Sequence, residues 1–85
     1  MAFEVNWHPK AVKFLEKLPK DVAIRIREKI DETKENPRRY IEKLVGSKDY
    51  RIRSGDYRVF VEVIYNPDTL SILAIRHRKD AYKRD

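Results

Sequence analysis

The sequence contains no cysteine and only two glycines among its 85 residues. The lack of cysteine excludes a disulfide framework and any thiolate zinc site, and it fits a reducing compartment. Two glycines are too few for a glycine-rich phosphate loop or a dinucleotide-binding fingerprint. These absences remove many nucleotide-dependent and thiol-dependent enzymes from consideration.

Long apolar runs are also missing. A helix that crosses a bilayer needs about 20 consecutive apolar residues, and no run in the sequence approaches that length. Residues 1–10 carry neither the apolar core nor the small-residue cleavage pattern of a secretory signal. We therefore expect a soluble cytoplasmic protein that folds as a single domain over residues 1–85, with one modest core.

Positive charge is what the sequence has in abundance. Charged residues make up 40% of the chain and the net charge is +6, with an isoelectric point near 9.7. Residues 1–42 hold ten lysines and arginines against eight acidic residues, whereas residues 43–85 hold ten against six. In the second half the arginines gather in two short runs. This balance predicts an anionic partner, which could be nucleic acid, an acidic protein segment or an anionic membrane.

The first half of the chain predicts one strand and two amphipathic helices. Pro9 suits the first turn of a helix, and Pro19 separates one helix from the next. Apolar periodicity predicts a strand over residues 3–7, a helix over Lys10–Leu18 and a helix over about Lys20–Lys34. The two helices form a hairpin that needs an apolar surface to cover.

The second half predicts a connector over Arg38–Glu42, followed by strands. The strands are expected at about Asp49–Arg53, Tyr57–Tyr65 and Leu70–Arg76, with a turn over Asn66–Thr69. The middle strand is apolar on both faces, which predicts a central position in the sheet. The order indicates an α+β domain in which an N-terminal strand and a helical hairpin pack on a mainly antiparallel sheet of about four strands.

The histidines and carboxylates form no familiar catalytic or metal-binding pattern. The two histidines have no partner at ligand spacing, and the acidic residues of the second half are scattered singly rather than paired for two-metal chemistry. We therefore expect no metal and no cofactor. Arginines, aromatic residues and one histidine remain as candidates for chemistry.

Two basic stretches contain these candidates. The first is a hairpin, Asp49–Val63, in which Arg51 and Arg53 alternate with apolar residues and Arg58 follows a tight turn. The second is Arg76–Tyr82. Three guanidinium groups on a short hairpin repel one another, and folding alone does not require them. We expect the two stretches to meet on the uncovered face of the sheet and to form an anion-binding site there.

One reaction class needs no more than such a site. Cleavage of RNA by its own 2′-OH requires an aligned ribose, neutralised phosphoryl oxygens and the transfer of a proton. Arginine forks bind phosphate oxygens in pairs, which suits Arg58 and Arg76. His77 and Tyr82 are candidates for proton transfer, and Tyr82 could equally stack on an unpaired base. Further RNA contacts are expected from Lys48, Arg78 and Lys79.

Each candidate also has an ordinary structural interpretation. Arg51 and Arg53 could be the charged solvent face of an edge strand. Arg58 could cap a loop carbonyl or pair with an acidic neighbour. His77 could be a surface or packed histidine, and Tyr82 could be a core aromatic near the terminus. Together these interpretations leave the gathering of like charge unexplained.

The two basic stretches in combination resemble a known family. L-V-G, then Y-R-I-R-S-G-D-Y-R-V, an apolar strand and I-R-H-R-K-D-A-Y are similar to the RelE/ParE superfamily of toxins of type II toxin–antitoxin systems. F-L-E-K-L-P in the helical hairpin agrees with it, so the resemblance covers nearly the whole chain. It implies a microbial-RNase-like α+β fold of the RelE type. The RelE branch implies a ribosome-dependent endoribonuclease that cuts mRNA in the decoding site.

The resemblance also implies roles for individual residues. Arg58 and Arg76 match arginines that hold the scissile phosphate, and Tyr82 matches a C-terminal tyrosine that stacks on or helps to activate the RNA. Arg51 and Arg53 lie where RelE-type toxins carry basic residues that line the site. Members with lysine at those two positions have a better proton acceptor, so the general base is open here.

Partners and two other activities follow from the same resemblance. The partners are a cognate antitoxin of the RelB type that wraps the toxin, the ribosome and mRNA, and operator DNA through the antitoxin complex, with no membrane. A ParE-like toxin has the same fold but inhibits DNA gyrase. A catalytically silent module would only bind the antitoxin. Arg51, Arg53 and Tyr82 favour RNA chemistry among these three.

Overall fold

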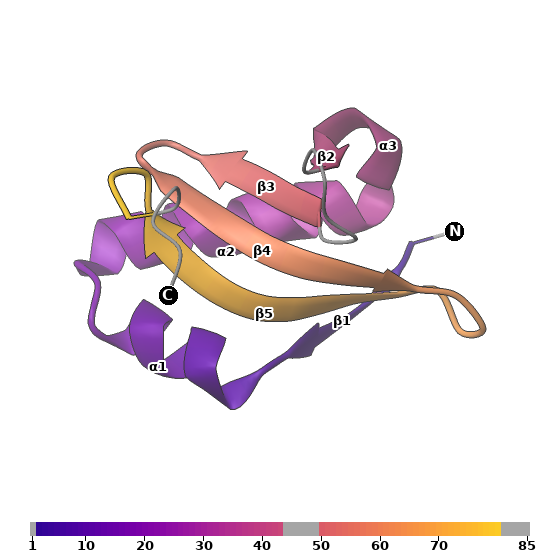
Figure 1. The fold of residues 1–85 in the computed structure, drawn as a ribbon, viewed down its shortest axis with the longest axis horizontal. Helices are drawn as coiled ribbons and strands as arrows, with labels where there is room; N and C mark the ends of the chain where they lie inside the picture. The colour runs from indigo at the N-terminus through magenta and orange to yellow at the C-terminus, as the bar shows by residue number, and fades with distance from the viewer. Residues whose placement is uncertain (1, 44–49, 81–85) are drawn as a thin grey trace.

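The computed structural model describes residues 2–43 and 50–80, which form one mixed sheet with helices on one of its faces (Figure 1). The sheet order is β1-β5-β4-β3-β2, so β4 is central, as its apolar pattern predicts. No helix among the described residues is long and apolar enough to cross a membrane. The elements, in chain order, are β1 (Glu4–Trp7), α1 (Pro9–Glu16), α2 (Lys20–Glu35), α3 (Pro37–Tyr40), β2 (Ile41–Lys43), β3 (Tyr50–Ser54), β4 (Tyr57–Ile64) and β5 (Thr69–His77).

The helical hairpin begins and ends at signals that are visible in the sequence. Pro9 occupies the first turn of α1, and the His8 Nδ1 atom accepts a hydrogen bond from the Lys10 backbone N–H at 3.2 Å. Pro19 precedes α2, which runs for 16 residues. Both helices were predicted, and no boundary differs from the prediction by more than two residues.

The sheet has five strands among the described residues, where about four were expected. β1 pairs in parallel with β5, and the other three pairings are antiparallel. The additional strand is β2, which has three residues and overlaps the end of the segment predicted as a connector. Its length explains the miss, because three residues are too short for an alternating pattern to be recognised. The remainder of that connector is the short helix α3.

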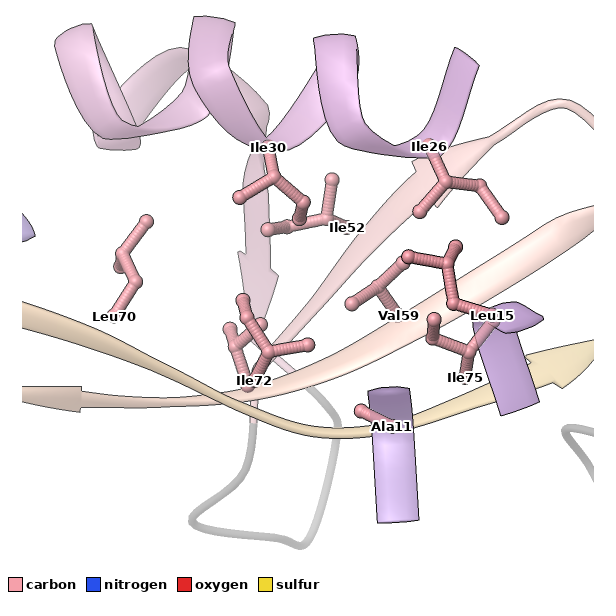
Figure 2. Close-up of a cluster of buried hydrophobic side chains, with 10 residues drawn as sticks. Ala11, Leu15, Ile26, Ile30, Ile52, Val59, Leu70, Ile72 and Ile75 are labelled. Atoms are coloured by element: carbon pink, nitrogen blue, oxygen red, sulfur yellow. The ribbon is translucent and has the colours of Figure 1, made fainter. Parts of the chain in front are cut away.

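The buried core lies between the helices and one face of the sheet. Ile26 and Ile30 of α2 point toward the strands, and Ala11 and Leu15 of α1 belong to the same buried cluster (Figure 2). The strands contribute the side chains of Ile52, Val59, Val61, Leu70, Ile72 and Ile75. Burying an aliphatic side chain of this size contributes about 1.5–3 kcal/mol, so this cluster is the main source of stability.

The opposite face of the sheet, here called the open face, carries different residues. Side chains alternate along a strand, so the neighbours of the buried residues point away from the helices. β3 contributes Arg51 and Arg53 to the open face, on either side of buried Ile52. The neighbouring strand β4 contributes Arg58 and Phe60, on either side of buried Val59. These four side chains therefore lie outside the core.

A β-bulge in β5 changes which of its residues reach the open face. Val61 is opposite Ile72, whereas Phe60 is opposite Ala74, so Leu73 is an extra residue in the ladder. Before the bulge the even-numbered Leu70 and Ile72 are buried, and after it the odd-numbered Ile75 is buried. A bulge re-aims the side chains that follow it. Arg76 consequently lies on the open face, where an unbroken alternation would have turned it toward the helices.

Candidate anion-binding site

Three arginines lie in one row across the open face of the sheet. Arg53 on β3 is directly opposite Arg58 on β4, and Arg58 is directly opposite Arg76 on β5. Neighbouring strands are about 4.8 Å apart, so the three residues, here called the arginine row, bring three positive charges together. Like charges placed directly opposite each other destabilise a sheet. The row therefore gathers more charge than the fold requires.

The tight turn between β3 and β4 sets the register of this row. Ser54 is opposite Tyr57, which leaves a two-residue loop of Gly55 and Asp56. Gly55 has a φ of 57°, a conformation that favours glycine at the first loop position of a type II′ hairpin. The turn was predicted from the sequence, and it brings Arg53 and Arg58 opposite each other.

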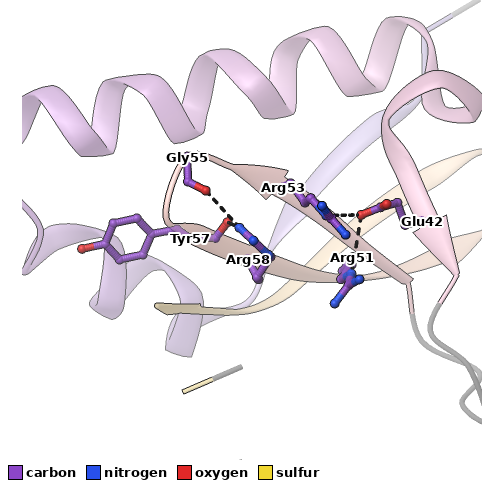
Figure 3. A network of polar contacts seen from close by, with 6 residues as sticks. All are labelled: Glu42, Arg51, Arg53, Gly55, Tyr57 and Arg58. Atoms are coloured by element: carbon purple, nitrogen blue, oxygen red, sulfur yellow. Dashed lines mark hydrogen bonds and ion pairs between the residues drawn. The ribbon is translucent and has the colours of Figure 1, made fainter. Parts of the chain in front are cut away.

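Glu42 of β2 holds two of the arginines on the open face (Figure 3). The Arg53 Nε–H donates a hydrogen bond to Glu42 Oε1 at 2.7 Å. The Arg51 Nε atom lies 3.5 Å from the same oxygen. The Arg51 side chain is only 17% exposed, whereas that of Arg53 is 55% exposed. One carboxylate therefore contacts two guanidinium groups, that of Arg53 within the arginine row and that of Arg51 beside it.

Edge protection does not explain Arg51. β3 lies between β2 and β4, and Arg51 is paired with Glu42 of β2. The interpretation of Arg51 as the charged face of an edge strand is therefore wrong. Arg53 lies beyond Ile52, the last residue of β3 that pairs with β2, so edge protection still applies to Arg53.

Arg58 is anchored to the backbone of the turn. One guanidinium nitrogen, Nη1, donates hydrogen bonds to the carbonyl oxygens of Gly55 and Tyr57, each at 3.0 Å. The loop-capping contact considered from the sequence is therefore present. The buried Nε–H groups of Arg58 and Arg51 make no hydrogen bond among the described residues, and the contact of Arg51 with Glu42 is an ion pair at 3.5 Å. A buried donor left unpaired costs about 1–3 kcal/mol. An anion bound beside these side chains would give their Nε–H groups an acceptor, so this cost favours anion binding.

His77 does not join the arginine row. It is opposite Tyr57 in the register, and the two rings meet edge to face with centroids 5.2 Å apart. Tyr57 in turn contacts Phe14 of α1, which places His77 on the helix-covered side of the sheet. The His77 Nδ1 atom accepts a hydrogen bond from the Lys79 backbone N–H at 3.2 Å. These contacts match the packed-histidine interpretation.

Arg78 and Lys79 follow β5 and lie close to the hairpin turn. The Arg78 backbone N–H donates to the Asp56 carbonyl oxygen at 2.7 Å, and its Nε atom lies 3.8 Å from Asp56 Oδ1. Both basic residues are exposed. The two basic stretches of the sequence therefore meet, as expected, at one end of the sheet.

Two predicted site residues lie outside the described residues. These are Tyr82, expected to stack on or activate RNA, and Lys48, expected to contact RNA. Their roles stay predictions. Among the described residues, no group of three or more histidine, aspartate or glutamate side chains could hold a metal ion.

Sequence reasoning missed Glu42 as a member of the site. It considered the carboxylates of the later strands, and it assigned Glu42 to a connector. The available signal was the alternation in I-E-K, where an apolar residue precedes an acid. Three residues could not establish that Ile41 points inward and Glu42 outward, so only the pairing of β2 with β3 reveals the contact.

Comparison with known proteins identifies the family. The family described as the ParE toxin of type II toxin–antitoxin systems (parDE) matches residues 5–82. The protein named RelE1 of Methanocaldococcus jannaschii is 34% identical over 88 residues, covering 98% of each chain. The chain therefore belongs to the ParE toxin family and is a type II toxin–antitoxin toxin of the RelE/ParE superfamily.

Solved structures agree with this assignment. The archaeal RelE–RelB complex from Pyrococcus horikoshii contains a chain that is 33% identical, with a TM-score of 0.78, covering 95% of this chain and 100% of that one. The RelBE2 complex from Mycobacterium tuberculosis contains a chain with a TM-score of 0.83 and 23% identity, covering 92% and 100%. The second likeness bears on the fold alone. The expected RelE-type α+β fold is confirmed.

Proposed function

We propose that this toxin is a ribosome-dependent endoribonuclease that cuts mRNA without a metal ion. The observation that carries the proposal is the arginine row, in which Arg53, Arg58 and Arg76 are aligned across three adjacent strands. The row offers a dense set of N–H donors on a face that the helices leave uncovered. The transition state of phosphoryl transfer carries negative charge on oxygen, and donors positioned in advance stabilise that charge.

Arg58 and Arg76 are the proposed ligands of the scissile phosphate. Arg58 is in the middle of the row, and the Gly55 and Tyr57 carbonyl oxygens fix one end of its fork. Planar guanidinium groups match phosphate oxygens in pairs. Arg53 and Arg51 extend the positive surface along β3 and hold the flanking RNA backbone, together with the exposed cations Arg78 and Lys79.

Glu42 is the proposed general base of the reaction. Arginine does not give up its proton at ordinary pH, so the row can bind phosphate without accepting a proton from the 2′-OH. The Glu42 carboxylate contacts Arg53 at 2.7 Å, and its side chain is 44% exposed, so it can meet a bound ribose. Tyr82 remains the proposed stacking or acid group. His77 is proposed to support the end of β5 through its contact with Tyr57.

The proposed protein partner is a cognate antitoxin of the RelB type. The solved relatives named above are complexes of RelE with RelB, or of RelBE2, and these support such a partner here. An antitoxin that wraps the toxin would shield the arginine row from RNA. Binding of operator DNA is proposed to occur only through the antitoxin complex.

Mapping of mRNA cleavage in a translating extract tests the proposed function. Wild-type toxin should cut mRNA within codons, and Arg58→Ala and Arg76→Ala should each lower the rate about 100- to 1000-fold, as expected for loss of one positioned donor. Arg27→Ala, which removes an exposed arginine from α2, is the matched control and should cut normally. Wild-type cleavage by both row variants would contradict the assignment.

Inhibition of DNA gyrase is the second candidate, because the matching family is described as the ParE toxin. A gyrase inhibitor would block supercoiling and leave mRNA intact. A supercoiling assay run beside the cleavage assay separates the two activities. Blocked supercoiling with intact mRNA would replace the nuclease proposal.

A further inference from the structure

Phe60 is a large aromatic side chain on the open face of the sheet. Its neighbours in β4, Val59 and Val61, are fully buried against the helices, so alternation turns Phe60 the other way. Phe60 is half-buried and does not belong to the residues that pack against the core. The core therefore does not account for this ring.

The surroundings of Phe60 are basic on one side and acidic on the other. Arg51 lies directly opposite it on β3, and Arg58 is two residues earlier in β4. The exposed Glu62 is two residues later. A phosphate bound near Phe60 is therefore drawn toward the arginine row and repelled from the Glu62 end of the strand.

The small side chain of Ala74 is opposite Phe60 on β5. The bulge at Leu73 creates this pairing, because an unshifted register would place Leu73 there. A methyl group covers less of a neighbouring ring than an isobutyl group does. The side of Phe60 that faces β5 is consequently the less obstructed side.

We propose that Phe60 is a stacking platform for an unpaired RNA base, next to the phosphate held by the arginine row. This inference rests on the proposed function and specifies how the same site grips its substrate. Two residues along a strand span about 6.6 Å, a separation that one nucleotide can bridge between its phosphate and its base. Aromatic rings accept any base on their faces, which suits single-stranded RNA.

The charges favour RNA over a protein segment as the occupant. Arg51, Arg58 and Arg76 surround the ring on three strands, and a nucleotide supplies both a flat base and the phosphate that such neighbours attract. An apolar peptide would cover the ring but would bring no anionic group to these basic side chains. Protein binding is therefore treated as an outcome that contradicts the proposal.

A double-mutant cycle between the ring and the base tests the platform. The probes are a fluorescein-labelled single-stranded RNA heptamer with 2′-O-methyl sugars, which cannot be cut because no free 2′-OH remains, and seven copies that each lack one base. Phe60→Leu removes the ring and keeps an apolar side chain, whereas Phe60→Tyr keeps the ring. Ile64→Ala, also on the open face but beyond Glu62, is the matched control.

Wild-type toxin should lose about tenfold in affinity when one particular base is absent, as a stacked base contributes about 1–3 kcal/mol. Phe60→Leu should bind the intact probe about tenfold more weakly, and loss of that base should then change its affinity less than about twofold. Phe60→Tyr and Ile64→Ala should behave as wild type. Urea unfolding of Phe60→Leu verifies that the chain is folded, and Phe60→Tyr provides the comparison if it is not.

Two results with a functional toxin would overturn the platform. One is wild-type RNA affinity in Phe60→Leu, and if antitoxin binding is weakened at the same time, Phe60 belongs to the protein interface instead. The other is a base-loss penalty that persists without the ring. A wild-type chain that binds no probe and cuts no mRNA would instead contradict the proposed nuclease function itself, and the platform with it.

Discussion

The two faces of the sheet are built from alternate residues of the same strands, yet they have opposite properties. On β3, Ile52 is fully buried while Arg51 and Arg53 on either side carry charge to the open face. On β4, Val59 is fully buried beside Arg58. The covered face lowers the free energy of the folded state, and the open face concentrates like charge. Residues that stabilise the fold and residues proposed to bind an anion therefore alternate along the same strands.

The energetic scale of the two faces differs accordingly. Truncating a buried aliphatic side chain removes transfer and packing energy and typically costs 2–5 kcal/mol. An exposed ion pair contributes only about 0–1 kcal/mol, and opposed like charges subtract a similar amount. Substitutions on the open face should thus change function with little effect on the free energy of unfolding. Substitutions on the covered face should mainly lower the free energy of unfolding.

Glu42→Gln should show the largest effect on the open face. The amide keeps the size of the side chain and an oxygen acceptor for Arg53, but it no longer takes a proton. If Glu42 is the general base, the single-turnover rate of mRNA cleavage on the ribosome should fall by about 100- to 10,000-fold. The free energy of unfolding should change by less than about 1 kcal/mol.

Glu62→Gln is the matched control for this variant. Glu62 is an exposed carboxylate on the same face, opposite Ser71 rather than an arginine, and its loss should leave the rate unchanged. Normal cleavage by Glu42→Gln would reduce Glu42 to a residue that positions Arg51 and Arg53. The proton would then have to be taken by another group.

Ile52→Ala and Arg53→Ala compare the two faces at adjacent positions. Ile52→Ala should lower the free energy of unfolding by about 2–5 kcal/mol, a large share of the roughly 5–15 kcal/mol typical of a domain. Arg53→Ala should lower it by less than about 1 kcal/mol, since it loses one exposed ion pair and relieves repulsion within the row. Urea is the suitable denaturant because guanidinium is a salt and screens charge. Equal destabilisation by both variants would contradict the conclusion that the covered face, and not the open face, stabilises the fold.

The sequence was sufficient to predict the covered face. Alternation in β4 and helical spacing in α1 and α2 are long patterns, and each is reinforced by proline or by the Gly55 turn. These features predicted the central strand and the helical hairpin. They also predicted that Arg51 and Arg53 leave the sheet on the uncovered side, which the register confirms.

The features that the sequence did not predict depend on contacts between segments that are distant along the chain. β2 is recognised only through its pairing with β3, and that pairing is what brings Glu42 to Arg51 and Arg53. The bulge at Leu73 is likewise a property of two paired strands. Strict alternation would have placed Arg76 with Leu70 and Ile72 on the covered face, so sequence resemblance predicted its role while periodicity could not predict its position.

The smallest predicted effect concerns the salt dependence of RNA binding by the open face. Each phosphate contact on single-stranded nucleic acid contributes about 0.7 to the slope of log affinity against log salt concentration. Arg53→Ala should flatten the slope by about that amount, so that a tenfold rise in salt weakens the variant about fivefold less than wild type. Arg27→Ala, on α2, should leave the slope unchanged. The measurement is a titration of the uncleavable heptaribonucleotide at several concentrations of sodium chloride. An equal change of the slope in both variants would mean that RNA affinity depends on the net charge of the whole protein. The arginine row would then not be the binding site.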